Sequence, residues 1–421
     1  MRVYKFGGAS VKDASGVKNL SRVLLQQGTR NTLVVVSAMG KMTNAFEKIV
    51  HAYLYQKEKL QPSLSYVKSY HLNLMSTLFL NDDPIFERVD GLLQSLDDFL
   101  DKNTSKEHDY VYDQVVCTGE LLATAIVSAY LTKQTISNEW LDIRTVISTD
   151  SNHRNAAVNW EATAANVKSL EKEVLYITQG FIARDAQQNT TTLGREGSDY
   201  TAGILGYCLS AESVTIWKDV PGVLNADPRV FDQTVLLEHI SYQEAVEMAF
   251  YGASVIHPKT IKPLENASIP LYVRSFEQLQ NTGTKVSKGA AITPKTSCFI
   301  VKKNQILVSI STSDFSFMAE DNLSRIFTQL HRNKLKVNLI QNSAISFSVC
   351  VEDNFDQFNA FYEALSSDFK IRYNTDVTMY TVRHFDAAAV KKIESKGLVL
   401  VKQSSRETIQ LVLDEKNNYE N

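Results

Sequence analysis

The first 290 or so residues alternate apolar, strand-like runs with helical stretches, and this alternation constrains the fold more than any other feature. The clearest apolar runs are TLVVVSAM (32–39), VLYITQGFI (174–182) and SVTIWKDV (213–220). Strands that alternate with helices predict a mainly parallel sheet with helices on both of its faces. We therefore expect an α/β fold in which a mainly parallel sheet is sandwiched by helices.

Residues from about 60 to 105 interrupt this alternation. Their apolar residues recur three and four positions apart, among them Val67, Leu74 and Leu78. This spacing is typical of amphipathic helices. We expect a helical insertion that packs against the core.

The last 125 residues change rhythm. Residues 305–374 show the order strand, helix, strand, strand, helix, strand, and a shorter set of the same kind follows up to residue 414. The run CFIVKKN (298–304) could supply the opening strand of the second set. We expect two α+β units, one inserted in the other. Because residues 281–296 are the best candidate boundary, the sequence predicts one domain over 1–293 and a second region over 294–421.

Composition points to small-molecule partners. Forty-four basic and 47 acidic residues give a net charge of −3, which provides no field to attract nucleic acid or a membrane. The four cysteines form no C-x-x-C pair, so neither a zinc site nor a disulfide framework is indicated. We see no secretory leader and no apolar run of membrane-spanning length, and we expect a cytoplasmic protein.

The N-terminal stretch VYKFGGASVKD (3–13) combines a short strand, two glycines and the start of a helix. Glycines let a ligand approach the backbone closely, and a helix start presents free N–H groups. A phosphate would suit this turn. An ordinary strand-to-helix turn with a surface lysine would explain the same residues.

Four further stretches carry candidate chemistry: SAMGKMTNAF (37–46), VCTGELLA (116–123), TTTLGREGSDYTAG (190–203) and WKDVPGVLNADPRV (217–230). We expect Thr43 just before a helix, as its N-cap, and Glu120 at the opening of another helix. Neither a G-x-x-x-x-G-K-[ST] nor a G-x-G-x-x-G motif occurs, which disfavours a P-loop nucleotidase or a Rossmann dehydrogenase.

Taken together, these motifs resemble the aspartate kinases of the amino acid kinase family, in the form without a fused second enzyme. The resemblance runs from the KFGG start through TTTLGR-x-GSDYTA, DVPG…DPR and HPKT to the paired C-terminal units, which are similar to ACT domains. It implies ATP-dependent phosphorylation of the L-aspartate side-chain carboxylate to 4-phospho-L-aspartate, the first step toward lysine, threonine and methionine. It also implies Mg²⁺, bound mainly through the ATP phosphates rather than by protein ligands.

The resemblance implies four groups of site residues: catalytic Lys5 and Asp199; phosphate-binding Gly7, Gly8, Ser10 and Lys259; substrate-binding Thr43, Glu120, Phe181, Arg195 and Ser198; and nucleotide-binding Lys218, Asp219, Asp227 and Arg229. The aspartate carboxylate is the nucleophile and is already ionised at pH 7, so no general base is needed. An arginine fork suits the α-carboxylate of the substrate, and a glutamate suits its ammonium.

Some residues have plainer interpretations or depart from the family pattern. Phe181 could be core, His257 a hydrogen-bonded structural residue, and Asp227 part of a turn. The departures are Ala9 for a threonine, Glu196 for a glycine, Lys218 for a threonine, and Ser254 where some relatives have lysine. We expect Lys259 to compensate for the last of these.

Paired ACT-like units imply a homodimer, or a tetramer built from it, that binds a pathway amino acid. The expected contacts with this effector are Ser316, Phe317, Met318, Asp321, Asn338, Gln341 and Asn342. Asn338 and Ala344 stand where lysine-sensitive relatives commonly carry acidic residues, so lysine, threonine and no effector all stay open.

Three other functions are less consistent with these residues. A glutamate or acetylglutamate kinase would share the sheet and the lysine-glycine start, but not the combination of GELLA, TTTLGR-x-GSD and ACT-like units. A catalytically dead amino-acid sensor is disfavoured because Lys5, Glu120, Arg195 and Asp199 are all present. A fused homoserine dehydrogenase is not expected, because the chain stops after the ACT-like region.

Overall fold

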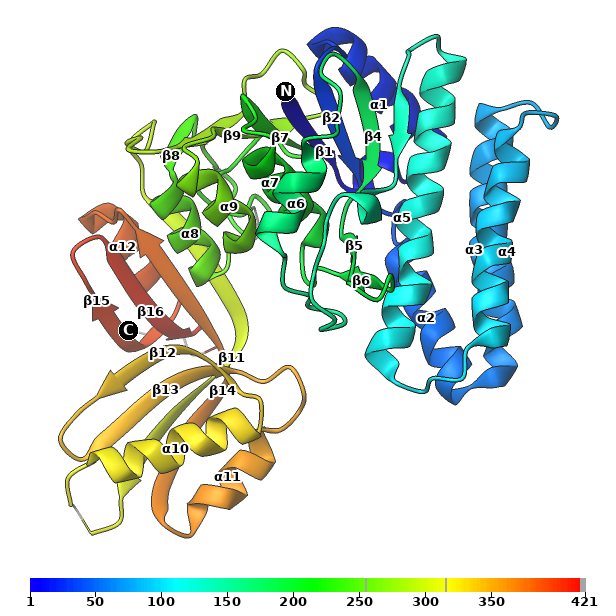
Figure 1. Ribbon diagram of the computed structural model, residues 1–421. Coiled ribbons are helices and arrows are strands. Elements are labelled where there is room, and N and C mark those ends of the chain that lie inside the picture. The colour runs from blue at the N-terminus through cyan, green and yellow to red at the C-terminus, as the bar shows by residue number, and fades with distance from the viewer. Residues whose placement is uncertain (254–255, 315, 417–421) are drawn as a thin grey trace. The chain divides into compact units, whose positions relative to one another are not determined.

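The computed structural model describes residues 1–253, 256–314 and 316–416 (Figure 1). The described chain forms two compact units. The first comprises 1–223, 236–246 and 256–294, and the second comprises 224–235, 247–253 and the described residues from 295 onward. The second unit thus takes two segments that lie far upstream of residue 294 in the sequence.

The first unit is built on an eight-stranded sheet with the strand order β3-β4-β2-β1-β7-β9-β10-β8. Its strands are β1 (Arg2–Phe6), β2 (Thr32–Val36), β3 (Glu139–Leu141), β4 (Leu175–Gln179), β7 (Ser213–Lys218), β8 (His239–Ser241), β9 (Leu271–Ser275) and β10 (Thr284–Ser287). All neighbouring strands are parallel except β9 and β10. A separate antiparallel hairpin pairs β5 (Ile182–Arg184) with β6 (Thr190–Thr192).

Helices cover both faces of this sheet (Figure 1). The α-helices between residues 14 and 266 are α1 (Ala14–Gln27), α2 (Met42–Tyr55), α3 (Leu60–Leu78), α4 (Ile85–Lys102), α5 (His108–Lys133), α6 (Trp160–Val167), α7 (Gly197–Cys208), α8 (Tyr242–Tyr251) and α9 (Pro258–Asn266). Of these, α3 and α4 lie beyond the helices that cover the sheet, and the last residues of α8 belong to the second unit. All five residues of the central strand β2 are buried, because a sheet covered on both faces has no solvent-facing side. The α/β class predicted from the alternation is confirmed.

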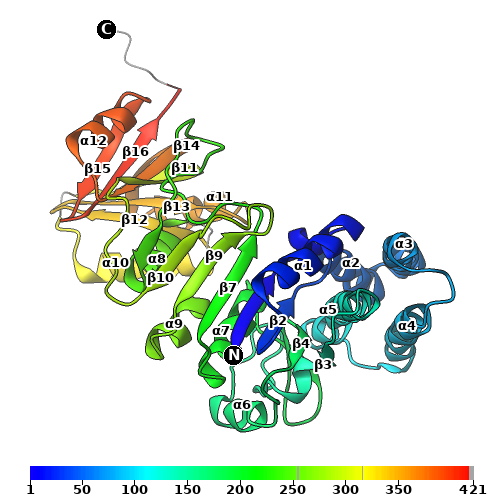
Figure 2. The ribbon, with the colours of Figure 1, turned by 90° about the horizontal axis from the view of Figure 1, so that it is seen from above.

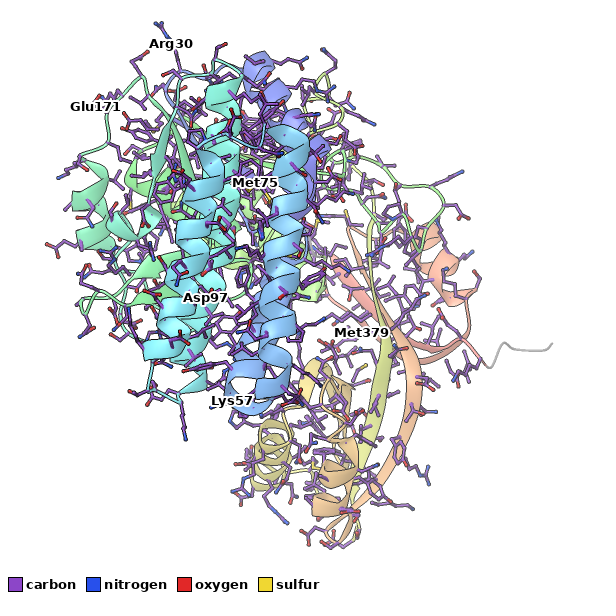
Figure 3. The ribbon with its side chains drawn as sticks, turned by 90° about the vertical axis from the view of Figure 1, so that its right-hand side faces the viewer. Arg30, Lys57, Met75, Asp97, Glu171 and Met379 are labelled. Carbon is purple, nitrogen blue, oxygen red and sulfur yellow. The ribbon has the colours of Figure 1, made fainter. Side chains whose placement is uncertain are left out.

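The stretch for which the sequence predicts helices, 60–105, holds α3 and α4. Figure 2 shows the two helices as an outer layer beyond α2 and α5, and Figure 3, in which Met75 and Asp97 are labelled, shows them running side by side. Their apolar residues are buried, including Val67, Met75 and Val89.

Helix α5 is long and strongly apolar, although Glu120 interrupts its apolar residues. By length and composition it could cross a membrane, since an 18-residue window has a mean hydropathy of 1.6. Within the unit, however, 89% of that window is buried. α5 is therefore apolar because it is the central core helix, in contact with α2, α4 and β4.

The second unit contains one six-stranded antiparallel sheet with the order β12-β13-β11-β14-β16-β15. Its elements are β11 (Cys298–Thr312), α10 (Glu320–Arg332), β12 (Lys336–Asn342), β13 (Ser346–Glu352), α11 (Phe358–Ser366), β14 (Phe369–Arg383), α12 (Ala387–Glu394), β15 (Leu398–Ser404) and β16 (Thr408–Asp414). The α+β character predicted for this region is confirmed.

The two expected units, one inserted in the other, share this single sheet. The runs 298–304 and 305–311, interpreted as two strands, form the single 15-residue strand β11, and β14 is equally long. The register shifts between Lys302 and Gln305, where Asn304 has a φ of 55°. Such a bulge lets one strand pass through a polar stretch without ending.

Candidate active site

A cleft of about 570 Å³ in the first unit collects all the predicted catalytic and substrate-binding residues. It is lined by Lys5, Ser37, Thr43, Tyr112, Glu120, Arg154, Phe181, Gly194, Arg195, Glu196, Gly197, Ser198, Asp199 and Lys218. Lys5, Ser37 and Lys218 come from the carboxyl ends of β1, β2 and β7, or directly follow them. Parallel strands bring these ends to one edge of the sheet, which is where α/β proteins bind ligands.

Lys5 and Asp199 form a buried ion pair in this cleft. The Lys5 Nζ lies 2.6 Å from Asp199 Oδ1, and the two side chains are only 11% and 5% exposed. Lys5 is fixed by its register in β1, between Val35 and Ile216, and Asp199 lies in the first turn of α7. The fold therefore brings together two predicted catalytic residues that lie far apart in the sequence of the first unit.

The glycine turn after β1 is closely packed against the loop after β2. A Cβ atom on Gly8 would lie 2.7 Å from the carbonyl oxygens of Ala38 and Gly40, and the Gly40 N–H donates to the Gly8 carbonyl at 3.0 Å. Only glycine fits such a backbone approach. The predicted phosphate residue Ser10 is buried in the following turn and lines a second hollow, of about 680 Å³.

Glu120 is a carboxylate that the fold buries without satisfying it. Its side chain is 2% exposed, its Oε1 accepts a hydrogen bond from the Ala38 N–H at 3.2 Å, and its Oε2 has no hydrogen-bond partner among the described residues. Burial raises the pKa of Glu120 to about 8. The expectation that Glu120 opens a helix is wrong, because α5 already begins at His108.

The segment that follows β6 lies against Phe181. A Cβ on Gly197 would lie 2.5 Å from the Phe181 ring, and the Phe181 N–H donates to Thr201 Oγ1 at 2.9 Å. Glu196, which replaces a glycine of the family pattern, adopts a left-handed φ of 53°. Phe181 has a φ of 71°, so it lines the cleft from a strained backbone as well as packing on the core.

Thr43 lines the cleft but is not an N-cap. Helix α2 begins at Met42, so Thr43 is its second residue, and the capping residue Lys41 makes no side-chain cap bond. The sequence interpretation missed the helix start because no capping residue marks it.

Several lining residues were not identified from the sequence, notably Ser37, Tyr112 and Arg154. Tyr112 donates a hydrogen bond from its hydroxyl to Glu47 Oε1 at 3.1 Å, and burial raises its pKa. Ser37 directly follows β2, so its place at the end of a buried strand was the one available signal. No motif marks Tyr112 or Arg154.

The model of the amino acid kinase family matches residues 1–275. The lysine-sensitive aspartokinase 3 of Escherichia coli (strain K12) is 30% identical over 354 residues, which span 83% of this chain and 78% of that protein. The chain belongs to the amino acid kinase family, as an aspartate kinase.

Two solved structures agree with membership in the aspartate kinases. Aspartokinase III of E. coli in complex with lysine and aspartate (T-state) matches with a TM-score of 0.84 and 25% identity. The same enzyme in complex with aspartate and ADP (R-state) matches with a TM-score of 0.78 and 26% identity. Each match covers 99% of this chain and 96% of the other chain, so the aspartate kinase fold includes both units.

The residues predicted to bind the nucleotide of this aspartate kinase are dispersed. Lys218 lines the cleft, whereas Asp219 lines the second hollow together with Ser10. Asp227 and Arg229 belong to the second unit, where they form an ion pair with each other at 2.7 Å. Their assignment to the nucleotide stays a prediction.

Lys259 does not line the cleft. Its Nζ donates to Asn155 Oδ1 at 2.7 Å, and it borders a separate hollow of about 370 Å³. The His257 Nδ1 accepts a hydrogen bond from the Lys259 N–H at 3.1 Å and caps α9, as a structural histidine would. Ser254, whose replacement Lys259 was expected to compensate, lies outside the described residues.

The predicted effector residues gather in the second unit. The Met318 N–H donates to the Ala344 carbonyl at 2.8 Å, which places the loop containing Ser316 and Phe317 beside the end of β12. Gln341 and Asn342 are exposed. Asp321 lies in the first turn of α10, and Asn338 is half-buried in β12.

Proposed function

We propose that the cleft transfers the γ-phosphoryl group of ATP to the side-chain carboxylate of L-aspartate. The observation that carries this proposal is the Glu120 carboxylate, buried in the cleft with one oxygen unpaired. A buried polar atom without a partner costs free energy that a ligand donor can recover. The α-ammonium of an amino acid is such a donor, and Arg195 lines the same cleft for the α-carboxylate.

The reaction needs positioning and charge compensation rather than a proton acceptor. An oxygen of the ionised aspartate side chain attacks the γ-phosphorus, the bond between that phosphorus and the β–γ bridging oxygen breaks, and ADP leaves. Lys5 compensates the charge on the moving phosphoryl group, and Asp199, 2.6 Å away, holds the Lys5 ammonium in place. The N-terminus of α7 directs its N–H groups and partial positive charge toward the same anions.

The residues of the cleft fit a magnesium ion that arrives with the nucleotide. Within the parts of the chain that are described, no group of three or more His, Cys, Asp and Glu side chains could hold a metal ion. Mg²⁺ in kinases is bound by one or two carboxylates together with phosphate oxygens. Asp199 would be the carboxylate that holds this ion next to the phosphates of the nucleotide. When bound, the ion neutralises charge on the β- and γ-phosphates.

An assay with three substrates tests the function. ADP release and hydroxamate formation are measured with L-aspartate, L-glutamate and N-acetyl-L-glutamate. We expect activity with L-aspartate and a much lower kcat/KM with the other two. N-acetyl-L-glutamate lacks the ammonium that Glu120 would bind, and the extra methylene of L-glutamate displaces its side-chain carboxylate from the phosphoryl group. A higher rate with N-acetyl-L-glutamate than with L-aspartate would contradict the proposal.

For the second unit we propose feedback regulation. The E. coli relative is named lysine-sensitive, and its solved structure contains lysine, which supports lysine as the effector. Asn338 and Ala344 lack the charge that would pair with a lysine ammonium, which supports threonine instead. Activity titrated with lysine, threonine and both decides between them. Inhibition by neither at millimolar concentration would overturn this part of the proposal.

The oligomer and the compartment belong to the same proposal. We infer a homodimer formed through the ACT-like units, or a tetramer built from it, because ligand sites shared between copies couple binding to quaternary structure. Light scattering with and without effector measures this, and a monomer under all conditions would contradict it. The four cysteines are free, which supports a reducing cytoplasm.

A further inference from the structure

Arg154 lines the cleft from a loop that α5 anchors firmly. The Asp113 carboxylate of α5 is fully buried and accepts hydrogen bonds from the Arg154 N–H at 3.1 Å and from the Thr192 hydroxyl at 2.6 Å. The Nδ1 atom of His153 lies 2.9 Å from the same carboxylate. The backbone at Arg154 is therefore fixed to both α5 and the end of β6.

The backbone of Arg154 is held in a left-handed conformation, with a φ of 65°. Residues with a Cβ atom disfavour this region, and they persist there where the surrounding structure over-determines them, often at functional sites. Phe181 and Glu196 in the same cleft share this feature, with φ values of 71° and 53°. The fold thus accepts strain at a position where it presents a guanidinium to the cleft.

The Arg154 side chain is supported but remains accessible. The carbon at the centre of its guanidinium lies 4.5 Å from the centroid of the Tyr112 ring, and its Nη1 lies 3.3 Å from Asp109 Oδ1. The Arg154 and Asp109 side chains are 45% and 57% exposed, so water screens their ion pair. An incoming carboxylate can therefore compete for the guanidinium while Tyr112 keeps supporting it.

The neighbours of Arg154 belong to the elements that form the amino-acid end of the proposed site. Tyr112 bonds to Glu47, one turn along α2 from Thr43. The Arg154 carbonyl lies 3.2 Å from the position of a Cβ on Gly194, the residue before Arg195. These contacts place Arg154 among the residues assigned to aspartate.

We propose that Arg154 is a second arginine for the α-carboxylate of the amino-acid substrate, acting together with Arg195. This inference rests on the proposed function and assigns a specificity role that no motif of the sequence indicates. Two guanidinium groups would select substrates with a free α-carboxylate, because an amide at that position has no charge for them to compensate.

The test compares Arg154→Ala and Arg154→Lys with a matched control, Arg88→Ala. Arg88 also stacks on an aromatic ring, 4.5 Å from Trp140, but it does not line the cleft. We expect Arg154→Ala to raise KM for L-aspartate about tenfold or more, with KM for ATP and kcat within about threefold. Arg154→Lys should recover part of the loss, and Arg88→Ala should stay within about twofold.

The α-amide of L-aspartate provides a readout that a purely structural role would not change. The wild-type preference for L-aspartate over this amide should fall about tenfold in Arg154→Ala, because the lost contact recognises only the acid. If Arg154→Ala left this preference or KM for L-aspartate unchanged, the inference would be overturned. The proposed kinase function would still stand as long as the wild-type enzyme phosphorylates L-aspartate. A wild-type enzyme without activity on L-aspartate would instead overturn the proposed function.

The variant Asp109→Asn tests whether Arg154 contacts the substrate or only anchors its loop through the ion pair with Asp109. This variant removes the ion-pair partner of Arg154 and leaves the guanidinium over Tyr112. We expect KM for L-aspartate to stay the same or fall slightly, because the arginine is released toward the substrate. If KM for L-aspartate rose as much as it does in Arg154→Ala, the ion pair between Arg154 and Asp109 would serve only to hold the loop, and the inference would be contradicted.

Discussion

Glu120 in the first unit and Asn338 in the second differ in how far the fold satisfies their polar atoms. In the first unit, Glu120 is 2% exposed and keeps one carboxylate oxygen without a hydrogen bond. In the second, the Asn338 amide is engaged at both ends, accepting from Lys302 Nζ at 2.7 Å and donating to Gln305 Oε1 at 2.7 Å. The cleft is a structure that a ligand completes, whereas the network around Asn338 is complete by itself.

The largest expected effect concerns the ion pair of the cleft. Lys5→Ala should lower kcat about a hundredfold or more, by analogy with a lost oxyanion donor worth roughly 3 kcal/mol. KM for L-aspartate should change far less, because the Lys5 charge matters most as the phosphoryl group moves. Steady-state kinetics checks this, and a kcat within threefold of wild type would remove Lys5 from the mechanism.

The next largest effect tests whether Arg195 binds the amino-acid substrate. Arg195→Lys should raise KM for L-aspartate roughly tenfold although the charge survives, because an ammonium cannot make paired parallel hydrogen bonds to a carboxylate. KM for ATP should barely change. If nucleotide binding were lost and aspartate binding kept, Arg195 would belong to the other end of the site.

Substitution of Glu120 and substitution of Asn338 should change Tm in opposite directions. The raised pKa of Glu120 means that its protonated form stabilises the fold below the unfolded-state pKa and that this contribution is lost as pH rises through about 8. Glu120→Gln should therefore raise Tm at pH 8.5. Asn338→Ala should lower Tm by removing a partner from the buried Gln305 amide and from the half-buried Lys302 ammonium, at a cost of about 1–3 kcal/mol. Thermal unfolding measures both Tm values. Shifts of the same sign would contradict the claim that one carboxylate oxygen of Glu120 lacks a hydrogen-bond partner in the fold while the Asn338 amide is engaged at both ends.

A smaller effect is expected from the helical insertion. The Tyr70 hydroxyl on α3 donates to the carbonyl of Lys12, just after the glycine turn, and lies 3.0 Å from the position of a Cβ on Gly40. Tyr70→Phe should lower kcat about fivefold or less, since one neutral hydrogen bond is lost. Tyr66→Phe, on the same helix and 59% exposed, is the control and should change nothing. Equal effects of the two variants would contradict a specific contact.

Sequence alone predicted the layers through local patterns, and it predicted the catalytic and substrate-binding residues of the cleft through motifs that resemble those of the aspartate kinases. Alternation of strands and helices predicts the sheet, and the motifs around Lys5, Glu120 and Asp199 mark its carboxyl edge. Element boundaries were less predictable. Helix α5 starts at His108 behind Glu107, which makes no side-chain cap bond, so the sequence carries no start signal there. The bulge near Asn304 likewise hid the continuity of β11.

Arg154 shows what such patterns cannot predict. Its place in the cleft depends on a left-handed backbone and on a buried carboxylate, Asp113, about forty residues earlier in the sequence. Neither feature leaves a local motif, because the interaction is set by tertiary packing. Exposed charged residues such as Arg154 are ordinarily solvated surface groups.

The central claim is that the unpaired Glu120 carboxylate receives the ammonium of the substrate. Its most direct test is calorimetric titration of L-aspartate at pH 7 in buffers of different ionisation enthalpy, which counts protons released on binding. With a pKa of about 8, Glu120 is mostly protonated in the free enzyme and must ionise to pair with the ammonium. We predict release of close to one proton per aspartate, and none from Glu120→Gln. Binding by the wild type without proton release would contradict the account.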